Sequence, residues 1–261
     1  MPRPLFEFFE AVVDELCTAP SRVLTRTDLE VDDTQAPLLD DLKREMNTSS
    51  TEAAVEAAVQ RLREHFAGKG SALPFDYDAS TGRFTTRDVD FLNFVREMRQ
   101  IRSLPKKSRD FECHVADRLQ HRATGTIHRV GHPQDTLKRA TAFNQHLKTL
   151  GFRGAVRVGK DKDGGFDILW LLPIGTIPHR PIVSVQCKNG EFNIGEADKS
   201  ISAGLRSFSD HRGLLPDIHV PCVLFNDYIS PEGLTPKQLN FVPLGLTDLS
   251  PMTQMMAITY I

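Results

Sequence analysis

Residues 163–190 contain two short apolar runs, marked off by a glycine pair, two prolines and a final glycine. The first run extends from Phe166 to Leu172 and the second from Ile182 to Val185. Short runs rich in β-branched and aromatic residues and bounded by Gly and Pro are typical of buried strands. Because only residues 173–181 separate the two runs, they predict an antiparallel hairpin inside a sheet.

Polar residues lie at one end of this predicted hairpin. Asp167 lies at the start of the first run, and Gln186-Cys187-Lys188 directly follows the second. Gln186 and Lys188 are two residues apart and share one face of a strand, whereas Cys187 points to the other face, into the core. A carboxylate, an amide oxygen and an ammonium group at one sheet end can bind a hard divalent cation and position a water for attack on a phosphate. The alternative is a strand cap and a solvated strand end.

The segments GGFDI (164–168) and VQCKNG (185–190) resemble the active-site motif of the PD-(D/E)-x-K nuclease superfamily. They are most similar to Mrr-like and some type II restriction endonucleases, in which Gln often replaces the first acid of the E-x-K element. The resemblance, over roughly residues 110–226, implies a restriction-endonuclease-like α/β core: a mixed sheet, antiparallel and then parallel, flanked by helices. It also implies a Mg²⁺ ion held by Asp167, Gln186 and the backbone carbonyl of Cys187, with Lys188 holding the attacking water.

The sequence departs from the superfamily motif in two places. Phe166 stands where the motif has Pro, and neutral Gln186 calls for a further carboxylate. The helix predicted over 110–120 (DFECHVADRLQ) is similar to an F-E-x-x-V helix of Mrr-like nucleases, which makes Glu112 the candidate catalytic acid and metal ligand. The segment FNQHLKTLGF (143–152) resembles the same helix with Asn144 in place of the acid, so Asn144 is the alternative.

The first hundred residues are predicted to be mainly helical. Ser49 and Glu52 form a capping-box pattern before a helix over 51–66, and a hairpin (74–88) and a helix (89–101) follow. Helices followed by a hairpin are consistent with a plain helical scaffold, and the alternative is a winged helix-turn-helix that reads DNA. A linker at 104–108 divides the chain into domains 1–104 and 105–261.

In the second domain further elements surround the hairpin. A helix over 134–150, a strand over 155–158, a helix over 196–208 and a strand over 218–226 that Pro221 interrupts are predicted. The tail from Ser230 has no clear pattern before a final apolar segment, 254–261, that can form an edge strand. Helix, strands, helix and strand is the order of the superfamily core.

The charge pattern bears on the choice of partner. The chain of 261 residues has 32 Lys plus Arg and 34 Asp plus Glu, which excludes an indiscriminate polycation. Residues 96–160, however, carry fifteen Lys plus Arg against five Asp plus Glu, together with five His. This excess suits a surface that follows DNA phosphates, and a solvated face balanced by acidic neighbours is the alternative.

Other classes of chemistry have weaker signals. The four cysteines form no C-x-x-C pair, which favours a reducing cytoplasm. Cys113 and four nearby histidines match no common zinc spacing. The acidic N-terminal segment is not a signal peptide, and no apolar run approaches the length of a membrane span, so we expect no membrane association. P-loop, dinucleotide-binding and G-x-S-x-G motifs are missing from the sequence.

These patterns together predict a Mg²⁺-dependent, sequence-specific endonuclease of the type II restriction kind. Its expected partners are double-stranded DNA, a second copy of the chain, because symmetric cutting of two strands calls for two sites, and a cognate DNA methyltransferase. A modification-dependent Mrr-like nuclease and a non-catalytic DNA-binding protein on a degenerate nuclease fold are the alternatives.

Overall fold

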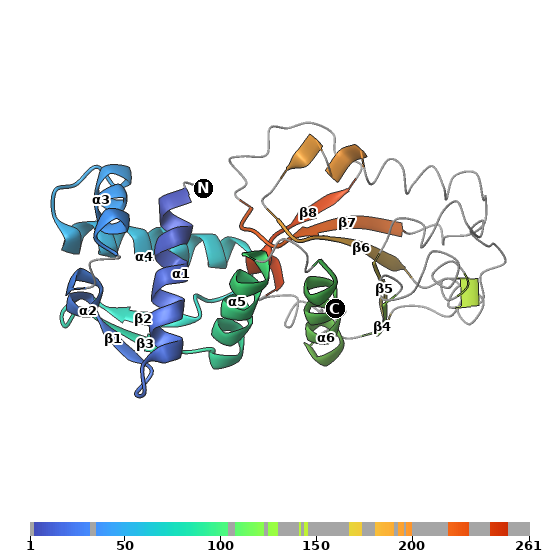
Figure 1. Ribbon diagram of the computed structural model, residues 1–261, viewed down its shortest axis with the longest axis horizontal. Coiled ribbons are helices and arrows are strands. Elements are labelled where there is room, and N and C mark those ends of the chain that lie inside the picture. Colours follow the sequence, from blue (N-terminus) through green and yellow to red (C-terminus); the bar gives the residue numbers. More distant parts are fainter. Residues whose placement is uncertain are drawn as a thin grey trace, which may run out of the picture. The chain divides into compact units, whose positions relative to one another are not determined.

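The chain folds into two compact units that divide between Gln100 and Ile101. The computed structural model, shown in Figure 1, describes residues 3–31, 35–103, 108–122, 125–129, 141, 144–145, 167–173, 181–190, 193–195, 197–199, 219–229 and 241–249. The division falls a few residues before the linker expected at 104–108, within the last turn of a helix. In this described part, no helix is both long enough and apolar enough to cross a bilayer.

The first unit combines helices with a small antiparallel sheet. Its elements are α1 (Arg3–Thr18), β1 (Val23–Thr25), α2 (Arg26–Val31), α3 (Ala36–Glu45), α4 (Thr51–Gly68), β2 (Phe75–Asp78), β3 (Arg83–Thr86) and α5 (Val89–Arg102). The hairpin β2–β3 is confirmed, and β1, which the sequence analysis did not predict, pairs with β3 in the order β1-β3-β2. Helix α1 packs against α3, α4, β1 and β3.

Helix α4 shows how local sequence sets an element. Its apolar residues recur at helical spacing and are all buried: Ala54, Val55, Ala58, Val59, Leu62 and Phe66. The helix begins at Thr51, and the Oγ atom of Ser50 accepts a hydrogen bond from the N–H of Ala53 at 3.3 Å. The cap is therefore Ser50 and not Ser49, because the capping side chain has to reach a free N–H of the first turn.

The core of the first unit is aromatic. Phe9 stacks on Phe75 with ring centroids 5.9 Å apart, and Phe66 meets Phe91 edge to face at 6.1 Å. These side chains come from α1, β2, α4 and α5, so a single cluster joins helices that are distant in sequence. Full burial of one such side chain stabilises the fold by about 1.5–3 kcal/mol.

The second unit is built on a five-stranded mixed sheet in the order β4-β5-β6-β7-β8. Its elements are α6 (Ser108–Arg122), β4 (Thr126–Arg129), β5 (Ile168–Leu171), β6 (Ile182–Lys188), β7 (His219–Phe225), β8 (Val242–Leu244) and a 3₁₀ turn (Leu246–Leu249). The pairs β4–β5 and β5–β6 are antiparallel, whereas β6–β7 and β7–β8 are parallel. Helix α6 packs on β4 and β6 (Figure 1). The predicted α/β class is confirmed, as is the change from antiparallel to parallel pairing.

The antiparallel hairpin predicted within residues 163–190 is confirmed. β5 pairs with β6 from Ile168 opposite Val185 to Leu171 opposite Ile182. All four residues of β5 are buried, as are the first four of β6. Strands with no exposed face carry continuous apolar sequence, which is why the two runs stood out.

One prediction in this unit was wrong. Pro221 does not interrupt its strand, because β7 continues through it and pairs Pro221 with Ser184 of β6. Strand β8 pairs with β7 only from Cys222 onward, so at Pro221 the strand has one ladder neighbour in the described sheet. A proline without an N–H is tolerated where its other side makes no ladder hydrogen bond.

The remaining expectations fall partly outside the described residues. Of the helix predicted over 134–150, only 141 and 144–145 are described, and they are helical. Of the helix predicted over 196–208, only residues 197–199 are described, and they are helical; residues 194–195, just before the expected start, are helical as well. The strand expected at 155–158 and the tail segment 254–261 lie outside the described residues.

Candidate active site

Asp167 is tied to β6 by two backbone hydrogen bonds. It immediately precedes β5, and its N–H donates to the carbonyl oxygen of Val185 at 3.0 Å. Its Oδ2 accepts a hydrogen bond from the N–H of Cys187 at 2.7 Å. Since these two partners flank Gln186 in the chain, the carboxylate of Asp167 is held beside this residue at the end of the sheet.

Gln186 and Lys188 are among the last three residues of β6. Both side chains are half-buried, between fully buried Val185 and Cys187. The Oε1 atom of Gln186 is buried and accepts no hydrogen bond from the described residues. A buried amide oxygen without a donor costs about 1–3 kcal/mol, so this atom is a natural position for a ligand.

The pKa of the Cys187 thiol is shifted by burial and by three charged residues. Burial raises the pKa of the Cys187 thiol well above its usual range, and the negative charges of Asp167 and Glu112 raise it further. The positive charge of Lys188 acts in the opposite direction. Electrostatic effects of this kind fall off with distance, so the three charged groups lie around one thiol. The thiol remains protonated at neutral pH and fills space in the core.

Glu112 reaches this region from helix α6. Its side chain is only 5% exposed, on a helix whose Phe111, Val115 and Leu119 are buried. Helix α6 packs against β6, and β4 begins shortly after the helix ends. A carboxylate that is nearly fully buried requires a partner or a cation. The structure therefore brings Glu112 into the surroundings of the residues that the sequence analysis selected on the hairpin.

The donor set can be tested against the cation that the sequence implies. In the described ranges, no group of three or more His, Cys, Asp or Glu side chains gathers as a metal site. Two carboxylates, from Asp167 and Glu112, and the amide oxygen of Gln186 are all hard oxygen donors, which suit Mg²⁺ rather than a thiolate-bound metal. The buried acceptor on Gln186 is the observation in this structure that fits a cation.

Asn144, the alternative to Glu112, lies in a helical segment of which few residues are described. Cys113, on α6, accepts a hydrogen bond at its Sγ from Nη1 of Arg129 on β4 at 2.6 Å. Of the histidines once grouped with Cys113, His114 lies on α6 and His128 on β4.

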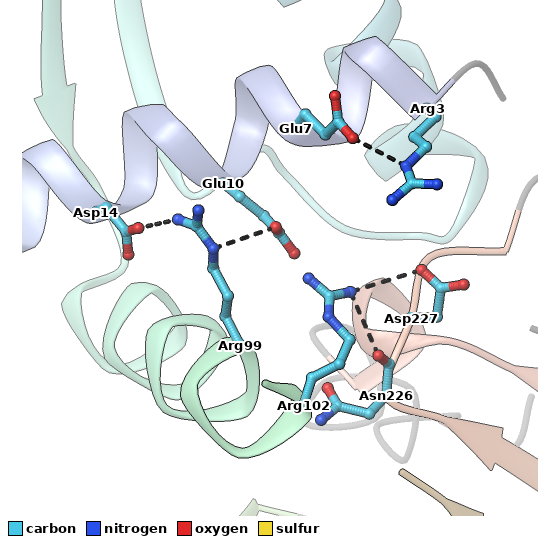
Figure 2. A network of polar contacts seen from close by, with 8 residues as sticks. All are labelled: Arg3, Glu7, Glu10, Asp14, Arg99, Arg102, Asn226 and Asp227. Atoms are coloured by element: carbon cyan, nitrogen blue, oxygen red, sulfur yellow. Dashed lines mark hydrogen bonds and ion pairs between the residues drawn. The ribbon is translucent and has the colours of Figure 1, made fainter. Parts of the chain in front are cut away.

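Sequence analysis missed a polar network behind Lys188. Figure 2 shows Arg102 at the end of α5, with its Nη1 3.4 Å from the carbonyl oxygen of Asn226 and 3.6 Å from Oδ1 of Asp227. The side chain of Asn226 donates to Oδ1 of Asn189 at 2.8 Å. The partners are far apart in sequence, and asparagine has no periodic signature, so no sequence signal could have found them.

No family model matches this chain, and comparisons with curated proteins and with solved structures found no match. The assignment of a function therefore rests on the residues and the fold.

Proposed function

We propose that the chain is a Mg²⁺-dependent DNA endonuclease with a restriction-endonuclease-like core. One observation carries the proposal: Asp167 is hydrogen-bonded to β6 on both sides of Gln186, and the buried Oε1 atom of Gln186 has no donor among the residues that the structure describes. An anion next to an unsatisfied amide oxygen at a sheet end is the arrangement that a hard cation needs.

The sheet topology and helix α6 support the same proposal. The resemblance implied the order helix, strands, helix and strand. Helix α6, strands β4, β5 and β6, the helical residues 197–199 and strand β7 follow that order. The short passage from α6 to β4 also suits the F-E-x-x-V helix of Mrr-like nucleases, with Glu112 as the carboxylate that a neutral Gln186 requires.

In the proposed site, Asp167, Glu112, Gln186 and the Cys187 carbonyl would hold the cation. When bound, Mg²⁺ would neutralise charge on the phosphate and lower the pKa of a coordinated water. The Nζ of Lys188 would hold the attacking water by hydrogen bonding and stabilise the negative charge that develops on the phosphate oxygens. Hydrolysis forms a P–O bond to the oxygen of the attacking water, which loses a proton to solvent, and breaks the P–O bond to the leaving oxygen, which takes up a proton from solvent.

The partners follow from the reaction. Cutting both strands of a duplex symmetrically needs two sites related by a two-fold axis, so we propose a homodimer on DNA. A nuclease of the restriction kind would also require a methyltransferase that protects the host sequence. Analytical ultracentrifugation with and without a DNA duplex tests the first of these proposals.

Plasmid digestion tests the activity. Purified protein is incubated with methylated and unmethylated supercoiled plasmid in Mg²⁺, in Mn²⁺ and in EDTA. Discrete fragments from unmethylated DNA, lost in EDTA, are expected. Cleavage restricted to methylated plasmid would favour the Mrr-like alternative. Sequencing of the fragment ends would then give the recognition sequence and the position of the cut.

The neutral Gln186 keeps one other function under consideration, a DNA-binding protein on a degenerate nuclease fold. Calorimetric titration with Mg²⁺ separates the two. We expect wild-type protein to bind the ion, and Gln186→Glu to bind it at least as tightly, because the substitution adds a negative charge to the donor set. Binding to DNA without Mg²⁺ binding and without nicked or linear product would identify the non-catalytic protein.

A further inference from the structure

A chain of hydrogen bonds ends at the backbone of Lys188. The Lys188 carbonyl oxygen accepts from the N–H of Asn226 at 2.9 Å and from the N–H of Gly190 at 3.0 Å. Lys188 is also in register with Phe225 of the parallel strand β7. Two donors on one carbonyl fix the backbone of Lys188 at the point where β6 ends.

The side chains of Asn189 and Asn226 extend this chain. Asn226 is fully buried, and its Nδ2 donates to Oδ1 of Asn189 at 2.8 Å. The Nδ2 of Asn189 donates in turn to the carbonyl oxygen of Ile101 at 3.3 Å. Ile101 lies in the last turn of α5, where carbonyl oxygens have no partner inside the helix. Asn189, the residue after Lys188, is thereby joined both to Asn226, which follows β7, and to Ile101, which belongs to the same unit.

Arg102 contacts the two residues that follow β7, Asn226 and Asp227. Its Nη1 lies 3.4 Å from the Asn226 carbonyl oxygen and 3.6 Å from Asp227 Oδ1 (Figure 2). The carbonyl oxygen of Asp227 accepts a hydrogen bond from the N–H of Leu246 at 2.8 Å. Buried polar networks whose members bond to one another rigidify the backbone that they join. The backbone at Lys188 and Asn226 is therefore more constrained than strand pairing alone would make it.

We infer that Asn189 and Asn226 are positioning residues for Lys188, and this inference rests on the proposed nuclease function. Neither side chain needs to touch DNA or the cation. They hold the backbone of Lys188 at the end of β6 and so determine where its side chain lies. An error of about 1 Å in the placement of a catalytic group can reduce a rate by about 10²-fold. The pair thus acts on the reaction through the Nζ of Lys188.

The test uses the full-length protein and three substitutions. Asn189→Ala removes the link between Asn226 and Ile101, and Asn189→Ser keeps a polar side chain too short to span it. Asn193→Ala is the matched control: Asn193 is exposed, lies in the same unit, and accepts a hydrogen bond from Gly195 at the start of a helix. Melting temperature, kcat and KM for plasmid cleavage are measured for each variant.

Both Asn189 variants are expected to lower kcat by about 10- to 100-fold with little change in KM, while Asn193→Ala keeps the wild-type kcat. The decisive readout is the double variant with Lys188→Ala. Because the pair acts through Lys188, Asn189→Ala should cause no further loss of rate once Lys188 has been removed.

Three outcomes would overturn the inference. The first is a wild-type kcat in the Asn189 variants, and the second is a loss that appears in full on top of Lys188→Ala. Both leave the nuclease function standing. The third is a wild-type protein that cleaves no DNA, which removes the proposed function and the inference together.

Discussion

Among the described residues, the first unit buries more aromatic rings than the second, whereas the second buries more polar residues. In the first, Phe8, Phe9, Phe66, Phe75, Phe84 and Phe91 are at most 1% exposed. In the second, the buried residues include Glu112, Ser184, Asn226, Thr247 and Asp248. Aromatic burial stabilises a fold directly, whereas a buried polar group is retained at a cost unless its partners are in place. The contrast indicates that aromatic packing holds the first unit together, whereas the second unit depends more on buried polar residues that need their partners in place.

The two units also differ in net charge. Residues 1–100 carry 12 Lys plus Arg against 19 Asp plus Glu, and residues 101–261 carry 20 against 15. An acidic unit is poorly suited to following DNA phosphates, whereas a basic one is well suited to it. The net charge of the whole chain conceals this difference, which becomes visible only when the units are counted separately.

The largest effect on stability is expected from Phe66→Ala in the first unit. Phe66 is fully buried between Phe9 and Phe91, so its removal should cost about 3–5 kcal/mol of the free energy of unfolding. Urea denaturation followed by far-UV circular dichroism measures the change. Val31→Ala, at a position 75% exposed, is the control and should change stability by less than about 0.5 kcal/mol. A similar loss in both variants would remove the aromatic scaffold from this account.

The next effect concerns the second unit and its chemistry. Lys188→Ala should lower the rate of DNA cleavage by about 10²–10³-fold, because the attacking water and the developing charge lose their cation. Mg²⁺ binding should persist, since the oxygen donors remain. Lys199→Ala, which removes an exposed lysine of the same unit, should cleave as the wild type does. Wild-type cleavage by Lys188→Ala would leave the cation site but exclude this lysine from the reaction.

Alkaline pH should weaken the second unit through its buried thiols. Burial, with the charge of Asp248, raises the pKa of Cys222 from 9.0 to about 12. The folded state therefore keeps a proton that the unfolded state loses, so this contribution to stability is complete below pH 9 and disappears as pH rises toward 12. At pH 10 the loss is about 1 kcal/mol.

Trp170 makes this measurable in the second unit, because it is the single tryptophan and lies buried in β5. Urea unfolding is followed by its fluorescence at pH 8 and pH 10. The decrease in stability should be smaller in Cys222→Ala than in the wild type, whatever the variant's stability at pH 8. An equal decrease would mean that this thiol does not titrate as described.

The smallest effect, on the salt dependence of DNA affinity, is expected from substitutions on helix α4 of the first unit. Its exposed charges are Glu52, Glu56, Arg61, Arg63 and Glu64. Arg61 pairs with Glu45 at 3.4 Å, and Arg63 donates to the Tyr77 carbonyl oxygen at 3.2 Å. If α4 does not follow phosphates, the double variant Arg61→Ala/Arg63→Ala should leave the salt dependence of DNA affinity unchanged. A slope reduced by about one per arginine would instead make α4 a DNA-reading helix.

The sequence predicted those elements whose physical cause is local. The hairpin β5–β6 was recognisable because strands buried on both faces are continuously apolar, and α4 because its apolar residues recur at helical spacing. Strand β4 was missed since none of its four residues, Thr126–Arg129, is buried: the two end residues are exposed and the two central ones half-buried, so the strand carries no apolar pattern. Strand β8 was missed because it is three residues long and contains a proline.

The candidate site was predictable to the same extent. Asp167, Gln186 and Lys188 stand at the ends of recognisable strands, so their neighbourhood followed from the hairpin. The hydrogen bond from the Cys187 N–H to Asp167 and the pairing of Asn189 with Asn226 join residues 20 and 37 positions apart. Contacts of this kind depend on how strands are assembled, which no local pattern specifies.

Cleavage by Asp167→Asn tests the central claim most directly. The asparagine keeps an oxygen that can accept from the Cys187 N–H, so the fold should be preserved while the negative charge that binds the cation is lost. Supercoiled plasmid is digested by wild-type and variant protein over a series of Mg²⁺ concentrations, and DNA binding is measured without metal. We predict a loss of cleavage of at least about 10²-fold, with DNA binding equal or tighter. Cleavage by Asp167→Asn at the wild-type rate would contradict the assignment of the site.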